Sequence, residues 1–295
     1  MSLPLECKQV LITGVGLRRL ETRFCNAQGQ LSHTLIEDGT DMYKANIGAA
    51  CALACAEQGA TVHMVARTTA SLQIIQRWII NETGQQVEYT PTDVTDSASL
   101  EKLVQGLPDD SPLHWVQSVG IGAGTVKLPD NNPYLLIEEI TPQLLEAELS
   151  VIQSTVTLMQ LLLARFRQQG GARICIISSM SAIRSFRSGS AHMAAKGALS
   201  RWTNAAMIEL APENIYITDV RPGGVDTGLY DPPAVQDRVA KICATYGYDW
   251  SRKAGGPKLI SPLEVGKAVA FILSLDCHVP SINMVGAGQM PHEGS

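Results

Sequence analysis

The chain has 295 residues, of which 45% are hydrophobic, and its formal net charge is −5. This composition provides enough apolar material for one large core and excludes a disordered chain, and the mild acidic balance argues against the basic surface that binds nucleic acid. No apolar run reaches the roughly 18 residues that span a bilayer. No signal sequence is recognisable and the seven cysteines lack CxxC spacing, so we expect reduced thiols in a cytoplasmic protein with no bound metal and no membrane partner.

Short β-rich runs alternate with helical runs along the chain. This alternation is typical of βαβ units, which form parallel sheets with right-handed crossovers. We therefore predict the α/β fold class: a Rossmann-type, doubly wound parallel sheet of about seven strands in the order 3-2-1-4-5-6-7, built as a single domain over residues 1–295. Strands are predicted at 8–12, 61–65, 87–89, 113–119, 172–177, 215–220 and 282–285, and helices at 47–58, 71–83, 100–107, 144–167, 191–210, 233–246 and 262–273.

One stretch, from Val15 to Tyr43, interrupts this alternation. A connection between a strand and the following helix usually takes only a few residues, so this stretch is an insertion at about 15–43. Residues 21–26 and 31–36 flank a polar segment at 27–30, which indicates a hairpin. Because both ends of the insertion meet at a strand-to-helix junction, we expect it to pack over the phosphate side of a cleft there, as a lid or as a plug.

Five segments of the chain carry a resemblance to a known family, in order and at the expected spacing. The segments are TG at 13–14, IGAACALACAEQGA at 47–60, ARICIISS at 172–179, HMAAK at 192–196 and PGGVDT at 222–227. On these segments, the sequence from residue 8 to about 230 resembles the short-chain dehydrogenases/reductases.

Three departures from the family pattern concern the cofactor and the chemistry. The glycine-rich turn TGxxxGxG takes eight residues in the family, but here it extends over 36 residues, from Thr13 to Gly48. Asn46 stands at its middle glycine, and asparagine tolerates a positive φ better than most residues. His192 stands where the family has its active-site tyrosine, and no asparagine between residues 132 and 204 can serve the family's proton relay.

The resemblance implies a nicotinamide dinucleotide whose pyrophosphate meets backbone amides at the start of a helix. Arg67 follows the second strand without the acidic neighbour of NAD sites, and an arginine fork suits a 2′-phosphate, so we expect NADP(H) rather than NAD(H). Three basic residues near the interrupted turn either add positive charge to it or are solvated: Arg18, Arg19 and Lys44. Asp93 either contacts the adenine of the cofactor or belongs to the N-cap region of a helix. The implied cofactor-binding residues are Thr13, Gly14, Gly48, Arg67, Asp93, Val94, Gly120, Lys196, Pro222, Gly223 and Thr227.

By the same resemblance Ser179, His192 and Lys196 form the catalytic group. Hydride transfer to a carbonyl leaves an oxyanion that needs a proton and hydrogen-bond donors. Histidine titrates near neutral pH, and Lys196 lies one helical turn further on the same face. The alternative interpretation is that His192 marks a protein that has left redox chemistry.

Two further residues are candidate substrate contacts. Arg184 precedes the catalytic helix, where it either binds a carboxylate or phosphate of the substrate or is solvated. Tyr230 lies in a substrate lid at about 228–260. Aromatic residues there either suit a ring-containing substrate or pack the lid itself. We predict an NADP(H)-dependent oxidoreductase that acts on a carbonyl/alcohol pair of a small organic metabolite. The alternatives are non-redox chemistry (isomerase, dehydratase or cyclase) and a non-catalytic ligand-binding protein. The resemblance also implies a homodimer or homotetramer, packed through the helices at 144–167 and 191–210.

Overall fold

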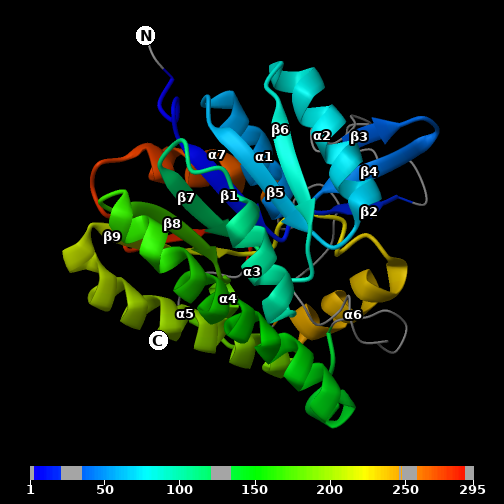
Figure 1. The fold of residues 1–295 in the computed structure, drawn as a ribbon. Coiled ribbons are helices and arrows are strands. Elements are labelled where there is room, and N and C mark those ends of the chain that lie inside the picture. Colours follow the sequence, from blue (N-terminus) through cyan, green and yellow to red (C-terminus); the bar gives the residue numbers. More distant parts are fainter. Residues whose placement is uncertain (1–2, 21–34, 121–133, 246, 248–257, 290–295) are drawn as a thin grey trace.

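The computed structural model describes residues 3–20, 35–120, 134–245, 247 and 258–289. Its centre is a seven-stranded sheet in which every neighbouring pair is parallel (Figure 1). The order β10-β9-β8-β7-β1-β5-β6 is the predicted 3-2-1-4-5-6-7 once the strands of the insertion are set aside, so this prediction is confirmed. The strands are β1 (Gln9–Thr13), β5 (Thr61–Ala66), β6 (Val87–Pro91), β7 (Leu113–Gln117), β8 (Ala172–Ile177), β9 (Ile215–Pro222) and β10 (Ser281–Met284).

Helices cover both faces of the sheet, and each face has its own apolar core (Figure 1). Side chains alternate between the two cores as the pleat requires: Val10 and Ile12 of β1 enter one core, and Leu11 enters the other. One core packs against α1 (Ile47–Glu57), α2 (Thr69–Thr83) and α7 (Pro262–Ser274), and the other against α3 (Ser97–Gly106), α4 (Pro142–Gln168) and α5 (Ser190–Leu210). The remaining helices are α6 (Pro233–Ala244) and the short 3₁₀ turns η2 (Ile137–Glu139), η3 (Met180–Ala182) and η4 (Ala211–Glu213).

Helix α1 is enclosed on all sides, because residues 48–56 are all buried. Small residues make this possible. A Cβ atom on Gly266 of α7 would lie 2.4 Å from the carbonyl oxygen of Ala50, so the two helices approach more closely than a side chain would permit. The amino-terminal end of α1 is thereby held firmly beneath the end of β1.

The described part of the insertion forms a small antiparallel sheet of its own, in the order β2-β4-β3. Its strands are β2 (Leu17–Arg19), β3 (Leu35–Asp38) and β4 (Asp41–Ala45). The hairpin predicted around 27–30 lies outside the described residues. The described hairpin joins β3 to β4 through Gly39, whose φ of 61° suits glycine, and Ile36 pairs with Tyr43.

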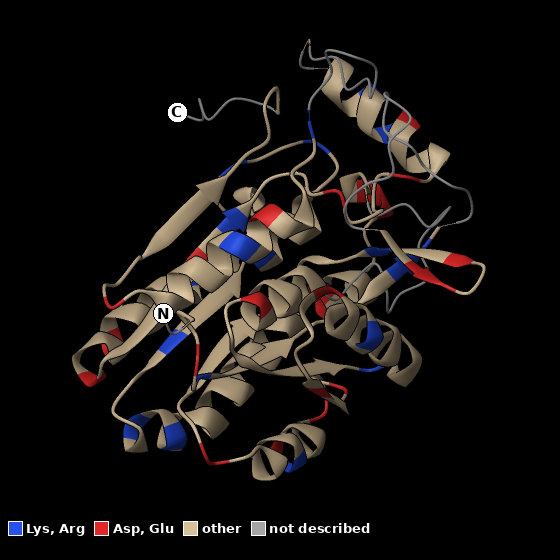
Figure 2. Ribbon diagram, turned by 90° about the horizontal axis from the view of Figure 1, so that it is seen from above, with Lys and Arg blue, Asp and Glu red and all other residues tan. Residues whose placement is uncertain are grey.

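Among the described helices α4 alone has the length and hydropathy of a membrane span. Its packing is that of a core helix: Leu158, Leu162 and Phe166 are almost fully buried against the second core. Its last turn carries Arg165 and Arg167, which bond to Gln9 and Glu213 respectively. Charged residues of both signs are interspersed over the described helices and loops (Figure 2).

Candidate active site

A cavity of about 1260 Å³ opens at the carboxyl ends of the parallel strands, where open α/β sheets bind their ligands. It is large enough for a dinucleotide together with a small substrate. Thirteen of the residues predicted from the sequence line it: Gly14, Arg67, Asp93, Val94, Gly120, Ser179, Arg184, His192, Lys196, Pro222, Gly223, Thr227 and Tyr230.

Two predicted cofactor residues, Thr13 and Gly48, are not among the residues that line the cavity: Thr13 is structural, and Gly48 both shapes the turn and keeps a backbone amide without an intrahelical partner. The Thr13 hydroxyl is buried between strands, where it accepts from Trp115 Nε1 (3.2 Å) and donates to the carbonyl of Val116 (3.4 Å). A Cβ on Gly48 would lie 2.7 Å from the Gly14 carbonyl oxygen, so Gly48 lets α1 approach the turn. Both residues shape the nucleotide end of the site from beneath.

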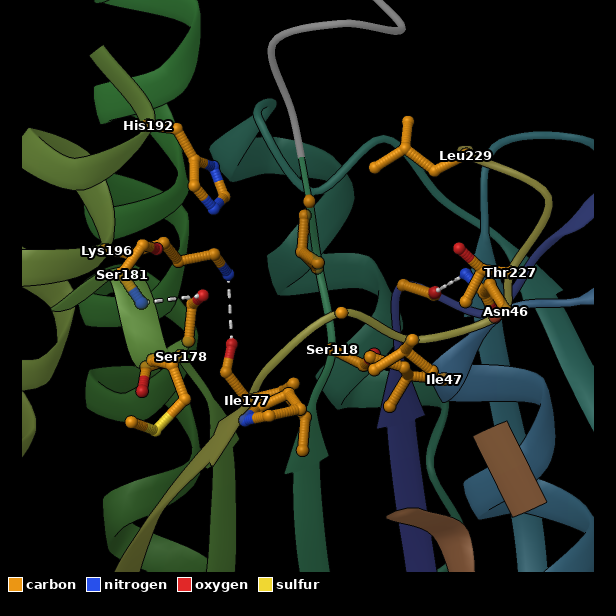
Figure 3. A pocket seen from close by; sticks show the side chains of 18 of the residues that line it. Asn46, Ile47, Ser118, Ile177, Ser178, Ser181, His192, Lys196, Thr227 and Leu229 are labelled. Carbon is orange, nitrogen blue, oxygen red and sulfur yellow. Dashed lines mark hydrogen bonds between the residues drawn. The ribbon is translucent and has the colours of Figure 1, made fainter. Parts of the chain in front are cut away.

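Asn46 closes the interrupted turn. It is the N-cap of α1 with a φ of −82°, so the positive φ that prompted its comparison with glycine is not used. Its Oδ1 accepts from the amides of Gly16 (3.0 Å) and Ala49 (2.9 Å), and its Nδ2 donates to the Gly14 carbonyl (2.8 Å; Figure 3). One side chain therefore joins both ends of the insertion to the start of the helix.

The turn keeps groups that fit a phosphate. The first amides of a helix have no intrahelical partner, and of those in α1 the Asn46 side chain takes that of Ala49, which leaves Ile47 and Gly48. Ile47 and Arg18 both line this part of the cavity. Burial lowers the pKa of the Arg18 guanidinium and Asp231 raises it, and the group stays cationic at any working pH.

Ion pairs connect the insertion to the segment that follows β9. Lys44 Nζ lies 2.6 Å from Asp226 Oδ1 and 3.0 Å from Asp231 Oδ2. The stem of Arg18 packs on Gly228, where a Cβ would lie 2.8 Å from Arg18 Cδ. The described part of the insertion thus borders the cavity, which Val15 and Arg18 line.

The other end of the nucleotide side of the cavity, away from the Asn46 turn, contains Arg67 and Asp93. Arg67 is exposed at the end of β5. Asp93 Oδ1 accepts from the backbone amide (3.0 Å) and the hydroxyl (2.7 Å) of Thr95, while the N-cap of α3 is Asp96, which accepts from the amide of Ser99. Asp93 is therefore a turn residue on the cavity wall, and the helix cap lies three residues further on.

The three predicted catalytic residues line the same cavity. His192 and Lys196 project into the cavity from α5 (Figure 3). Ser179 follows the end of β8. Ser179 Oγ accepts from the amide of Ser181 (3.1 Å), which leaves its proton for a ligand. Lys196 is buried and its Nζ donates to the Ile177 carbonyl (3.0 Å). Burial lowers the pKa of Lys196 to about 8, although Glu148 and Asp219 oppose this shift.

A buried polar network supports the catalytic helix from behind. Asp219 of β9 has no exposed surface and accepts from the hydroxyls of Ser178 and Ser200 and from Arg221 Nε (2.8 Å). Ser178 adjoins Ser179, and Ser200 lies one turn after Lys196 on α5. The network therefore fixes β8, β9 and α5 relative to one another.

Among the cavity residues that the sequence analysis did not predict, three can contribute to catalysis or substrate binding: Glu148, Tyr134 and Phe186. Glu148 of α4 places Oε2 3.7 Å from His192 Nδ1. Tyr134 and Phe186 form an aromatic wall with Tyr230, with ring centroids 6.4 Å (Tyr134–Phe186) and 6.1 Å (Tyr134–Tyr230) apart. Burial raises the pKa of both tyrosines, so both phenols stay neutral. No sequence motif marks Glu148, Tyr134 or Phe186, whereas Tyr230 was expected in the lid. The other aromatic residues expected in the lid lie outside the described residues: Tyr246, Tyr248 and Trp250.

Comparison with known proteins agrees with this geometry. A family model described as short chain dehydrogenase matches residues 44–235. The chain is 27% identical over 205 residues to a 3beta-hydroxysteroid dehydrogenase of Mediterraneibacter gnavus, covering 67% of this chain and 70% of that protein. It is 26% identical over 232 residues to a tropinone reductase homolog of Arabidopsis thaliana, covering 77% of this chain and 66% of that protein.

Two solved structures share the fold. L-sorbose reductase from Gluconobacter frateurii, in complex with NADPH and L-sorbose, has a TM-score of 0.69 at 18% identity and covers 98% of both chains. A 3-oxoacyl (acyl-carrier-protein) reductase from Agrobacterium tumefaciens with NADP bound has a TM-score of 0.69 at 20% identity, covering 95% of this chain and 93% of the other. The protein described here belongs to the short-chain dehydrogenase family. It is an oxidoreductase of that type.

Proposed function

We propose that this protein is an NADP(H)-dependent oxidoreductase that interconverts a carbonyl and an alcohol in a small organic molecule, with His192 as its acid–base residue. One observation carries the proposal: Ser179, His192 and Lys196 line the same cavity as the nucleotide-side residues Gly14 and Arg67. A substrate held against Ser179 therefore lies within the space that a dinucleotide would share.

The residues divide the work of carbonyl reduction among them. A dinucleotide held in this cavity would supply the hydride. Ser179 Oγ donates a hydrogen bond to the carbonyl oxygen, and His192 gives that oxygen a proton as the negative charge develops. The buried Lys196, whose pKa of about 8 leaves it mostly protonated at neutral pH, stabilises the same charge. In the reverse direction His192 accepts the hydroxyl proton.

The preference for NADP(H) rests on Arg67. Its exposed guanidinium stands at the end of β5, after Ala66 rather than an acidic residue, and suits a 2′-phosphate. The two structural relatives with NADP or NADPH bound support this choice. Arg67→Ala should weaken NADPH binding at least tenfold and leave NADH binding nearly unchanged.

The aromatic wall supports a substrate with a flat or ring-shaped apolar part. Tyr134, Phe186 and Tyr230 approach the catalytic end of the cavity from three separate segments. Arg184 lines the same end and suits a substrate carboxylate or phosphate. The proposed substrate class is thus a small ring-containing carbonyl or alcohol with an anionic group.

A second candidate function is non-redox proton transfer, and one observation favours it. The Asn46 side chain occupies amides of Gly16 and Ala49 at the turn that binds the pyrophosphate in this family. Fewer amides for the pyrophosphate would suit a protein that uses its histidine without a dinucleotide.

Calorimetry with NADPH and NADH separates the two functions. Binding of NADPH in the micromolar range supports the redox proposal, and no heat with either dinucleotide at millimolar concentration refutes it. Once a substrate is found, His192→Ala should lower kcat by about 10²–10⁴ with NADPH affinity unchanged. His192→Tyr, which restores the family residue, should retain activity if the reaction is ordinary carbonyl reduction.

A further inference from the structure

Glu148 is a carboxylate that the proposed chemistry has not yet used. It lies on α4 with 14% of its side chain exposed, and it faces the catalytic helix α5. A carboxylate buried to this degree needs a cation or a hydrogen-bond donor nearby. α5 offers it two, because His192 and Lys196 lie one turn apart on the face that lines the cavity.

The geometry assigns the two basic residues different tasks. Lys196 Nζ is committed to the Ile177 carbonyl and acts on Glu148 through charge alone. His192 turns Nδ1 toward Glu148 Oε2 at 3.7 Å, an ion-pair distance, and 41% of its side chain is exposed. With Nδ1 directed at α4, the other ring nitrogen, Nε2, is left for a ligand in the cavity. Of the described charged residues, Arg184 also lines this end, from the loop after β8.

We propose that Glu148 is the positioning residue for His192. Its carboxylate accepts from Nδ1–H, fixes that tautomer and stabilises the imidazolium, so that the transferable proton resides on Nε2. Small side-chain movements bring the 3.7 Å separation to hydrogen-bond distance in the free protein, and substrate binding shortens it further, because catalytic hydrogen bonds commonly tighten on binding. The catalytic part of this inference rests on the proposed function of His192, but the pairing itself does not.

The pairing has a readout that needs neither cofactor nor substrate. The ¹⁵N spectrum of the imidazoles, with the His192 signals assigned from the His192→Ala variant, reports which ring nitrogen carries the proton in the neutral form. The wild-type protein should show His192 as the Nδ1–H tautomer. Glu148→Ala should abolish this preference, whereas Glu148→Gln, which keeps an acceptor oxygen without the charge, should largely retain it.

The matched control is Glu146→Ala, because Glu146 lies on the same helix, is exposed and carries the same charge. It should leave the His192 tautomer and kcat unchanged. Glu148→Ala should lower kcat by about ten- to a hundredfold, a part of the contribution expected for the acid itself, with NADPH affinity unchanged. The kcat of Glu148→Gln should lie between that of Glu146→Ala and that of Glu148→Ala.

The possible failures are distinguishable. A His192 tautomer that Glu148→Ala does not alter overturns the inference, whatever happens to activity. A tautomer that does change, in an enzyme whose kcat survives His192→Ala, confirms the pairing and overturns the proposed function of His192. A loss of activity in Glu148→Ala with an unchanged tautomer assigns Glu148 a role other than positioning and also overturns the inference.

Discussion

Replacing Lys44 with methionine tests how the insertion is held against the cavity. The Lys44 side chain is 4% exposed, and its ammonium group lies between the carboxylates of Asp226 and Asp231. Methionine keeps most of the apolar stem and removes the charge. The two carboxylates would then face each other without their shared cation, in a place where Asp231 is 6% and Asp226 is 25% exposed.

The expected loss follows from this burial. Removing one partner of a buried ion pair costs about 3–5 kcal/mol, because the remaining charge stays desolvated. Both carboxylates have further interactions and Asp226 is partly exposed, so we expect the lower end of this range, about 3 kcal/mol. Urea denaturation measures it as a fall in the free energy of unfolding. NADPH affinity should fall as well, because Lys44 pairs with Arg18 across the small sheet.

Arg19→Met is the matched comparison. Arg19 also lies 2.6 Å from a carboxylate, that of Asp41, and belongs to the same small sheet, but its side chain is 68% exposed. Exposed pairs contribute little, because water and salt screen them. The Arg19 variant should be as stable as the wild type. Equal effects of Lys44→Met and Arg19→Met would show that burial does not decide the strength of these pairs and would refute the reasoning.

Three further predictions concern the cofactor, pH and assembly. Arg18→Ala should weaken NADPH binding at least tenfold in calorimetry, whereas Arg19→Ala should not, since only Arg18 lines the cavity. Burial depresses the pKa of Lys196 from 10.5 to about 8, so the unfolded chain binds more protons in that interval and the contribution of Lys196 to stability rises between pH 8 and 10.5. Lys196→Met should remove this rise, worth about 3 kcal/mol, from the pH dependence of urea unfolding. We propose that the chain self-associates through α4 and α5, so Ile208→Glu on α5 (77% exposed) should reduce the mass in light scattering, while Phe271→Glu on α7 (63% exposed) should not.

The architecture was predictable because it depends on local patterns. Runs such as 172–177, followed by an amphipathic helix, specify a βαβ unit without knowledge of its neighbours. The spacing from Ser179 to His192 and Lys196 matches that of the family, and this was sufficient to predict that the three residues line one cavity. Thr13 and Gly48 show the limit of such reasoning. They match the family's turn, but whether a matching residue touches the ligand or supports the turn depends on which of its atoms face the cavity.

Glu148 and Asn46 could not be assigned from the sequence for a different reason. Glu148 meets His192 only because α4 packs beside α5, and the 43 residues between them in the chain contain no signal of that contact. Asn46 was compared with glycine for its backbone, but its function comes from its side chain, which reaches back to Gly14 and Gly16. Predicting such tertiary contacts requires knowledge of how the chain runs through the whole fold, and no local sequence pattern contains that information.

The same residue gives the sharpest test of whether the interrupted turn binds a phosphate. Asn46→Asp keeps an N-cap oxygen for the amides of Gly16 and Ala49, and aspartate caps helices as well as asparagine does. It loses the donor to the Gly14 carbonyl and places a negative charge beside Ile47, where the pyrophosphate is expected. The free energy of unfolding should therefore change by less than about 1 kcal/mol.

NADPH binding should respond quite differently. A carboxylate a few ångströms from a phosphate opposes binding by about 1 kcal/mol in water and by several where solvent is partly excluded, so affinity should fall at least tenfold. Because the repulsion is electrostatic, the loss should shrink as salt is added. A stable Asn46→Asp protein that binds NADPH as tightly as the wild type would show that the pyrophosphate does not lie at this turn. A dinucleotide would then have to reach the cavity by contacts other than those of α1, and the insertion would be a plug rather than part of the site.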